Sequence, residues 1–268
     1  MGRGILSVDP DDHDESQAAA TSERMRPHRG AHAQRTAQSH AAHLLPHLRP
    51  GMRLIDLGCG PGSITVGLAA AVTPGLTVGV DVDAVPVNGV AVVVGDVRRL
   101  PFPDASFDAI FASAVLQHVA EPADVLREAR RVARTGAVIA LVDADWDGEL
   151  LHPTNAVLRR SREVAERLRS HSSPFVGKQL RQLLDDAGFV RAEASASVLN
   201  HGTADETRAV GQFTADLFRH PASVERAVRE GIATRDELEE MARAWTEWGE
   251  RRGAFLARFW CEAVAWAP

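Results

Sequence analysis

"LIDLGCGPGSITVGLA", residues 54–69, is the stretch that decides the fold. It starts as an apolar strand that carries Asp56, passes through Gly58, Gly60 and Gly62 at alternate positions, and then becomes helical. Glycine lets the main chain turn tightly and approach a ligand without a Cβ in the way. The helix that follows directs free N–H groups and a positive dipole end at an anion. Such a unit occurs in several nucleotide-binding classes, nicotinamide and flavin enzymes included.

Further short apolar runs place this unit in an α/β sheet. "LTVGV", "VAVVVG", "FDAIFA" and "AVIALVD" follow it, mostly separated by helical segments, which predicts a mainly parallel sheet. The exception is "VGVDVDAVPVNGVAVVVGDV", residues 78–97, where Asn88-Gly89 is a strong local hairpin signal. Pro86 prevents a full helix there. We predict that these two strands are nevertheless parallel, with the crossover shortened to 82–89, because only then do Asp81 and Asp96 meet at one edge of the sheet.

Two later motifs separate the possible classes. "VGDVRRLPFPDASFDAIFA" joins an acid-ended strand to a "LPFPD" loop and the next strand, and "VLQHVAEPADVLREARRVARTGAVIALVDAD" follows it. With these motifs the chain resembles the class I S-adenosylmethionine-dependent methyltransferases, in the small-molecule branch related to quinone-biosynthetic, UbiE-like enzymes. The resemblance covers about residues 33–268 and is strongest over 52–143. Thr135-Gly136-Ala137 departs from the usual Pro-Gly-Gly but keeps the glycine of the turn.

The resemblance implies a Rossmann-like, doubly wound α/β fold. We expect a mainly parallel seven-stranded sheet with an antiparallel last strand and the shortened crossover between strands 2 and 3. The domain is expected over 31–268, with a lead-in helix over about 34–50 and helical lid insertions at about 145–175 and 202–252. Residues 1–30 lack apolar periodicity and are rich in Asp, Ser, Arg and Gly, which predicts a flexible arm.

The same resemblance implies S-adenosylmethionine as cofactor, S-adenosylhomocysteine as product, and no metal. Carried over by position, Asp81 binds the ribose, Asp96 and the Val97 main chain bind adenine, the glycine loop lies against the methionine portion, and Arg35 meets the methionine carboxylate. The residues assigned to the cofactor are Arg35, Asp56, Gly58, Cys59, Gly60, Gly62, Asp81, Val82, Asp96, Val97 and Ser113.

Methyl transfer needs a general base only if the nucleophile arrives protonated. His118 follows the fourth strand and either acts as the base, lines the acceptor pocket or packs locally. Other candidates for the base are His152, His201, Asp143 and Asp145. Most aromatic side chains of the insertions are expected to pack in a core. Those assigned to the substrate are Trp146, Phe175, Phe213 and Trp245.

Two further residue patterns have competing interpretations. Cys59 is a potential nucleophile, yet its place between two glycines favours a small packing residue. His40, His43 and His47 recur at i, i+3 and i+7, which is compatible with a metal face or, in the favoured interpretation, a solvated or ligand-facing helix.

Composition limits the function. The net charge of −6 argues against a nucleic-acid partner. No apolar run reaches the roughly 18 residues that a membrane span needs, and two isolated cysteines favour a reducing, cytoplasmic location. We expect methyl transfer to a small or medium organic acceptor, at N, O or C, in specialised metabolism. The alternatives are a cofactor-dependent cyclisation or rearrangement without methylation, and a non-catalytic regulatory protein. A homodimer through the lead-in or lid helices stays open.

Overall fold

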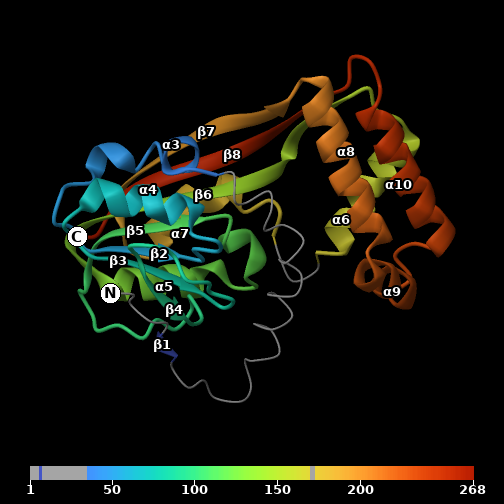
Figure 1. Ribbon diagram of the computed structural model, residues 1–268. Coiled ribbons are helices and arrows are strands. Elements are labelled where there is room, and N and C mark those ends of the chain that lie inside the picture. Colours follow the sequence, from blue (N-terminus) through green and yellow to red (C-terminus); the bar gives the residue numbers. More distant parts are fainter. Residues whose placement is uncertain (1–5, 8–34, 170–172) are drawn as a thin grey trace. The chain divides into compact units, whose positions relative to one another are not determined.

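One eight-stranded sheet organises the chain, with the strand order β1-β4-β3-β2-β5-β6-β8-β7 (Figure 1). The computed structural model describes residues 6–7, 35–169 and 173–268. The strands are β1 (Leu6–Ser7), β2 (Leu54–Leu57), β3 (Thr77–Asp81), β4 (Ala91–Val94), β5 (Phe107–Ser113), β6 (Ala133–His152), β7 (Val190–His201) and β8 (Phe255–Trp266).

The helices alternate with the strands in the first half of the chain and dominate the second half. Helices α3 and α4 lie on one face of the sheet and α5 and α7 on the other, which is the doubly wound arrangement (Figure 1). The helical elements are α3 (Ala37–His40), η2 (Leu45–His47), α4 (Ser63–Val72), η3 (Leu116–His118), α5 (Pro122–Val132), α6 (Ala156–Arg167), η4 (Gly177–Gln179), α7 (Leu180–Asp186), α8 (Ala204–Arg219), α9 (Pro221–Arg229) and α10 (Arg235–Gly249).

The short connection between β3 and β4 has the predicted geometry. The two strands are parallel, with Val80 opposite Val93 and Asp81 opposite Val94. Residues 82–90, which join them, contain no helix. The hairpin interpretation of Asn88-Gly89 is therefore excluded, and Asp81 and Asp96 leave their strands at the same edge of the sheet.

The rest of the sheet follows the prediction, with one addition. Neighbouring strands from β4 through β3, β2 and β5 to β6 pair in parallel, and the sheet carries one antiparallel strand, the last one, β8. The sequence did not indicate β1, whose two residues pair in parallel with β4. Apart from Leu6 and Ser7, the predicted arm over 1–30 lies outside the described residues.

The predicted continuous helix over 34–50 is wrong. Only α3 and η2 are helical there, because the chain leaves the helical region at Ala41, whose φ is −131°. Pro46 then occupies the start of η2. Proline lacks an N–H and its ring clashes with the carbonyl four residues earlier, so it is tolerated at a helix start and disfavoured inside one.

The chain forms two compact units. The first comprises Met1–Asp143, Val176–Ala196 and Cys261–Pro268, and its core lies on the sheet around Ile55, Ile110 and Ile139. The second comprises Ala144–Phe175 and Ser197–Trp260. The proposed lid insertions at 145–175 and 202–252 fall within this second unit, and their action as a lid stays a prediction.

Helix capping and close helix packing define the second unit. Thr203 and Thr234 begin α8 and α10 with capping boxes completed by Glu206 and Glu237. A Cβ at Gly211 of α8 would lie 2.6 Å from a main-chain oxygen of α10, so glycine permits the close approach of these two helices. Within the part of the chain that the structure describes, no helix has the length and apolar character to cross a membrane.

Candidate functional site

The glycine loop after β2 is the centre of the site. Gly58, Gly60 and Gly62 have φ of +68°, +51° and +78°, the left-handed region that favours glycine. A Cβ at Gly58 would overlap the side chain of Val115, and one at Gly62 would overlap Val87, so packing requires both glycines. A Cβ at Gly60 would meet no protein atom within 4 Å. The main chain at Gly60 therefore faces open space in which a ligand can lie.

Asp81 holds this loop by a hydrogen bond and can still accept hydrogen bonds from a ligand. Its Oδ2 accepts a 2.8 Å hydrogen bond from the Gly60 N–H, and its Oδ1 accepts a 3.0 Å bond from the Asp83 N–H. An ionised carboxylate offers about four lone-pair positions. Two positions are thus left for donors such as the two hydroxyls of a ribose.

Asp56 lies beneath the loop rather than on its surface. The carboxyl is 3 % exposed and its Oδ2 accepts a 2.5 Å hydrogen bond from Thr65 Oγ1 in α4. Burial, reinforced by the charge of Asp81, raises the pKa of Asp56 to about 7 even though the Thr65 bond opposes the shift. This geometry ties the end of β2 to the first turns of α4.

Cys59 has the properties of a packing residue. Its side chain is buried, and a Cβ at Gly79 of β3 would lie only 2.7 Å from its Sγ. Burial, together with the charges of Asp56 and Asp81, raises the pKa of the Cys59 thiol well above its usual range. The thiol is therefore protonated at neutral pH, which disfavours the nucleophile interpretation.

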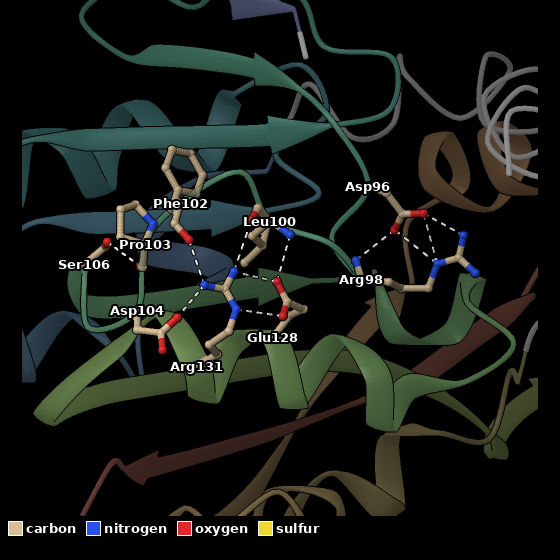
Figure 2. A network of polar contacts seen from close by, with 9 residues as sticks. All are labelled: Asp96, Arg98, Leu100, Phe102, Pro103, Asp104, Ser106, Glu128 and Arg131. Atoms are coloured by element: carbon tan, nitrogen blue, oxygen red, sulfur yellow. Dashed lines mark hydrogen bonds and ion pairs between the residues drawn. The ribbon is translucent and has the colours of Figure 1, made fainter. Parts of the chain in front are cut away.

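Asp96 is engaged by a neighbouring guanidinium (Figure 2). It accepts a 2.8 Å bond from the Arg98 N–H, and the Arg98 Nη2 lies 2.6 Å from its Oδ2. The intervening Val97 is buried, and Val82 stands at the start of the β3–β4 connection. Arg98 therefore fixes the orientation of Asp96, a contact that the sequence analysis missed although the two residues are only two positions apart.

The "LPFPD" loop beside Asp96 is clamped to α5 (Figure 2). Arg131 donates 3.0 Å and 2.8 Å hydrogen bonds to the carbonyl oxygens of Leu100 and Phe102, and it pairs with Asp104 and Glu128 at 2.8 Å each. These contacts hold the connection from Asp96 to β5 in one position.

A second polar group lies at the carboxyl end of β5 and within β6. The Ser113 hydroxyl and the Asp143 Oδ1 are buried without a hydrogen-bond partner among the described residues. The Asp143 Oδ2 accepts a 2.9 Å bond from the Leu116 N–H, which anchors η3. Burial raises the pKa of Asp143 to about 7, although the main-chain N–H groups of residues 115–117 and the charge of Arg35 oppose this shift. Burial also lowers the pKa of Arg35 to about 10, although Asp143 opposes that shift. These two buried oxygens can therefore accept a hydrogen bond from a ligand or from a water molecule.

The structure separates the three histidine candidates for the base. His118 ends η3 in the first unit, beside the residues that Asp143 anchors. His152 and His201 end β6 and β7 in the second unit. Burial lowers the pKa of His201, and the nearby Arg258 adds to this effect. Only His118 therefore shares a unit with the glycine loop.

Two histidines of the 40–47 pattern, His43 and His47, pack against β8. His43 Nδ1 lies 3.9 Å from Glu262 Oε2, and burial lowers the pKa of His43. His47 makes an edge contact with Trp266, with ring centroids 5.2 Å apart. Across the described residues, no three or more His, Cys, Asp or Glu side chains are arranged to hold a metal ion.

The aromatic residues assigned to substrate differ in exposure. Trp245 is 1 % exposed and donates a 2.8 Å hydrogen bond to Ser161 Oγ, so it belongs to the core of the second unit. Phe175 and Phe213 are half-buried. Trp146 is half-buried and contacts arginine side chains. Of the four, Trp245 is the one whose ring the structure withholds from a ligand.

The stretch from β2 into β6 carries the family signature. Residues 55–141 match the family described as "Methyltransferase domain". The chain carries a methyltransferase domain over these residues. The matched residues include the glycine loop, Asp81, Asp96 and η3, whereas Arg35 and Asp143 lie outside them.

Curated relatives agree with the assignment. A methyltransferase of Schizosaccharomyces pombe (C1B3.06c) is 28 % identical over 84 % of this chain and 88 % of its own length. The demethylmenaquinone methyltransferase of Roseiflexus sp. is 38 % identical over 40 % of this chain and 46 % of its own. The 27-O-demethylrifamycin SV methyltransferase of Amycolatopsis mediterranei is 31 % identical over 64 % of this chain and 65 % of its own length. This methyltransferase chain thus covers less than two thirds of the length of the latter two relatives.

Solved structures share the fold. The YcgJ protein of Bacillus subtilis superposes with a TM-score of 0.56 at 16 % identity, covering 84 % of this chain and 96 % of that one. A methyltransferase from an antibiotic biosynthesis pathway of Anabaena variabilis superposes with a TM-score of 0.54 at 20 % identity, covering 82 % and 94 %. At these identities the likeness concerns the fold of the methyltransferase alone.

Proposed function

We propose that this methyltransferase transfers the methyl group of S-adenosylmethionine to a small or medium organic acceptor. The observation that carries the proposal is the parallel pairing of β3 with β4, which brings Asp81 and Asp96 to the edge where Gly60 leaves its main chain open. When bound, the cofactor supplies an electrophilic methyl group: the sulfur–methyl bond breaks, a bond from the methyl carbon to N, O or C of the acceptor forms, and S-adenosylhomocysteine leaves as a neutral thioether.

The residues present fit this cofactor. Asp81 has two carboxylate positions for the ribose hydroxyls, and Gly60 offers the uncovered main chain. Asp96, oriented by Arg98, is assigned to the adenine amino group. Arg35 is assigned to the methionine carboxylate, because a half-buried guanidinium gains from a further anionic partner.

Proton removal is assigned to the group around η3. Asp143 has a buried oxygen without a partner and a pKa of about 7, close to the value at which a base works best at neutral pH. We assign Asp143 the role of receiving the proton when the acceptor is a hydroxyl or an ammonium, either directly or through His118. With a nucleophile that carries no proton, the same residues only orient the acceptor and exclude water.

The relatives support a small organic acceptor. The Roseiflexus and Amycolatopsis enzymes are named for demethylmenaquinone and 27-O-demethylrifamycin SV, both organic small molecules. We extend this class to the present protein and place it in specialised metabolism, without naming the acceptor.

Calorimetry with S-adenosylmethionine and S-adenosylhomocysteine tests the proposal. The unchanged protein should bind both, and Asp81→Ala should weaken S-adenosylhomocysteine about 100-fold, because two hydrogen bonds to a charged group contribute roughly 1.5 kcal/mol or more each. Asp185→Ala, which removes an exposed carboxylate from α7, is the matched control and should bind normally. Absence of binding by the unchanged protein, or equal binding by Asp81→Ala, would refute the proposal. Product formed from a true acceptor without S-adenosylhomocysteine would show a cyclisation or rearrangement instead.

A further inference from the structure

A pocket of about 220 Å³ lies within the second unit, apart from the residues assigned to the cofactor. It is formed by the end of β6 and the first turns of α6. Its volume corresponds to that of about seven water molecules, which is enough for one ring with a short side chain. Its apolar wall consists of Trp146, Leu151 and Leu158, and its charged wall of Glu149, Arg159 and Arg162.

The charged wall has an excess of positive charge. The Glu149 side chain is 4 % exposed and is shared by two guanidiniums: it accepts a 2.7 Å bond from Arg258 Nε and pairs with Arg162 Nη1. A single buried carboxylate thus serves two guanidiniums within this wall. Glu166, one turn further along α6, also attracts Arg162, but it is exposed and lines a different pocket.

Arg159 adds a second cation at the rim. Its side chain is exposed, and among the described residues no ion pair or side-chain hydrogen bond engages its guanidinium. Neighbouring arginines on α6 behave differently: Arg160 pairs with Glu163 at 2.9 Å. Arg160 is thus neutralised by its own helix, whereas Arg159, which lines the pocket, is available to a ligand.

The aromatic wall is held by cation–π contacts. The guanidinium carbons of Arg162 and Arg169 lie 4.9 Å and 4.5 Å from the centroid of the Trp146 ring. Arg162 also donates a 3.3 Å hydrogen bond to the Trp146 carbonyl oxygen. The Trp146 ring and the Arg162 guanidinium therefore lie side by side, an apolar surface beside a positive one.

We propose that this pocket binds a carboxylate attached to an apolar, ring-sized body, with the carboxylate at Arg159 and Arg162 and the body against Trp146, Leu151 and Leu158. Burial strengthens a carboxylate–guanidinium pair at Arg162, and two arginines permit contact with both carboxylate oxygens. This binding does not depend on the proposed function.

Nitrogen-15 NMR of the full chain labelled at tryptophan tests the binding without any cofactor. The chain has five tryptophans, and Trp146→Phe identifies the indole signal of Trp146. Titration with 3-phenylpropionate should shift that signal saturably. The alcohol and the ammonium with the same body, 3-phenylpropanol and 3-phenylpropylammonium, should bind at least about tenfold more weakly, which corresponds to about 1.4 kcal/mol. Acetate, which lacks the apolar body, should also bind at least about tenfold more weakly.

Paired charge reversals on α6 locate the anion. Arg159→Glu should weaken 3-phenylpropionate about fivefold, the effect of an exposed ion pair near the upper end of its usual range. Arg159→Ala should weaken 3-phenylpropionate about two- to threefold. This variant removes the positive charge without placing a new negative charge on the helix, so its effect cannot come from repulsion by that charge. Arg167→Glu is the matched control, because Arg167 is likewise exposed on the same helix and lines the other pocket. It should leave the dissociation constant unchanged.

Several results would overturn the inference: an unmoved Trp146 signal, equal binding of the alcohol or the ammonium, or equal weakening by Arg159→Glu and Arg167→Glu. Calorimetry with S-adenosylhomocysteine on the same samples separates this inference from the proposed function. If the unchanged protein does not bind S-adenosylhomocysteine but 3-phenylpropionate shifts the Trp146 signal, the proposed function alone is refuted. If it binds S-adenosylhomocysteine but the Trp146 signal does not move, the pocket proposal alone is refuted.

Discussion

Gly60→Ala isolates the one position in the glycine loop where the fold leaves space for a ligand. Its φ of +51° costs a residue with a Cβ roughly 1–2 kcal/mol. The added Cβ itself meets no protein atom within 4 Å. Gly58→Ala and Gly62→Ala are less informative, because their Cβ atoms would overlap Val115 and Val87 and would damage packing as well.

Gly51→Ala provides the matched control. Gly51 has a φ of +90° and likewise has no atom within 4 Å of an added Cβ. It precedes β2, whereas the glycine loop follows it, so it lies at the opposite edge of the sheet. Both variants should therefore lower the free energy of unfolding by about 1–2 kcal/mol, which is a fall of roughly 2–8 °C in Tm for a chain of this size.

Ligand binding should distinguish the two variants. If the Gly60 main chain lies against the cofactor, its Cβ occupies ligand space, and S-adenosylhomocysteine should bind at least about tenfold more weakly, or about 1.4 kcal/mol. Gly51→Ala should bind normally. Calorimetry at a temperature well below both melting transitions measures the difference. Unchanged affinity in Gly60→Ala, or an equal loss in Gly51→Ala, would refute the placement of the ligand.

Three further outcomes are expected. Burial raises the pKa of Asp143 to about 7, so protonation of this carboxyl stabilises the fold fully below about pH 4 and this contribution is lost as pH rises toward 7. The free energy of unfolding, measured with urea, should therefore rise in Asp143→Asn relative to the unchanged protein by about 2 kcal/mol as the pH is raised from 5 to 8. A difference between the two proteins that does not depend on pH would contradict the raised pKa of Asp143. Trp245→Phe leaves the buried Ser161 hydroxyl without its donor, so the free energy of unfolding should fall by about 1–3 kcal/mol, while a changed S-adenosylhomocysteine affinity would argue against a core role. Arg98→Ala removes the guanidinium contacts to Asp96 and should weaken S-adenosylhomocysteine about three- to tenfold. An unchanged dissociation constant in calorimetry would argue against Arg98 as a positioning residue.

The connection between β3 and β4 illustrates how local and long-range signals compete. Asn88-Gly89 between valines favours a hairpin locally, yet the strands are parallel. The requirement that Asp81 and Asp96 reach one ligand predicted the correct pairing, because it is a constraint on the whole sheet. The lead-in segment shows the opposite case: apolar periodicity predicted a helix over 34–50, and Pro46 with the turn at Ala41 divided it.

The sequence by itself determined the elements whose signals are local. The glycine turn, the acids at the carboxyl ends of β3 and β4, the succession of strands along the chain from β2 onward and the resemblance to methyltransferases are all readable from residues adjacent in the chain or spaced at fixed intervals. Glycine in a left-handed turn and a carboxylate after a strand have the same meaning in any context that forms the sheet.

Only the tertiary structure decided the contacts between distant residues. Asp143 lies within reach of the charge of Arg35, Glu149 pairs with Arg258, and Trp245 bonds to Ser161. No spacing rule links such partners, because the packing of the whole unit sets their separation. Burial, likewise a property of the folded unit, raises the pKa of Asp143 and takes Trp245 from the predicted substrate residues into a core.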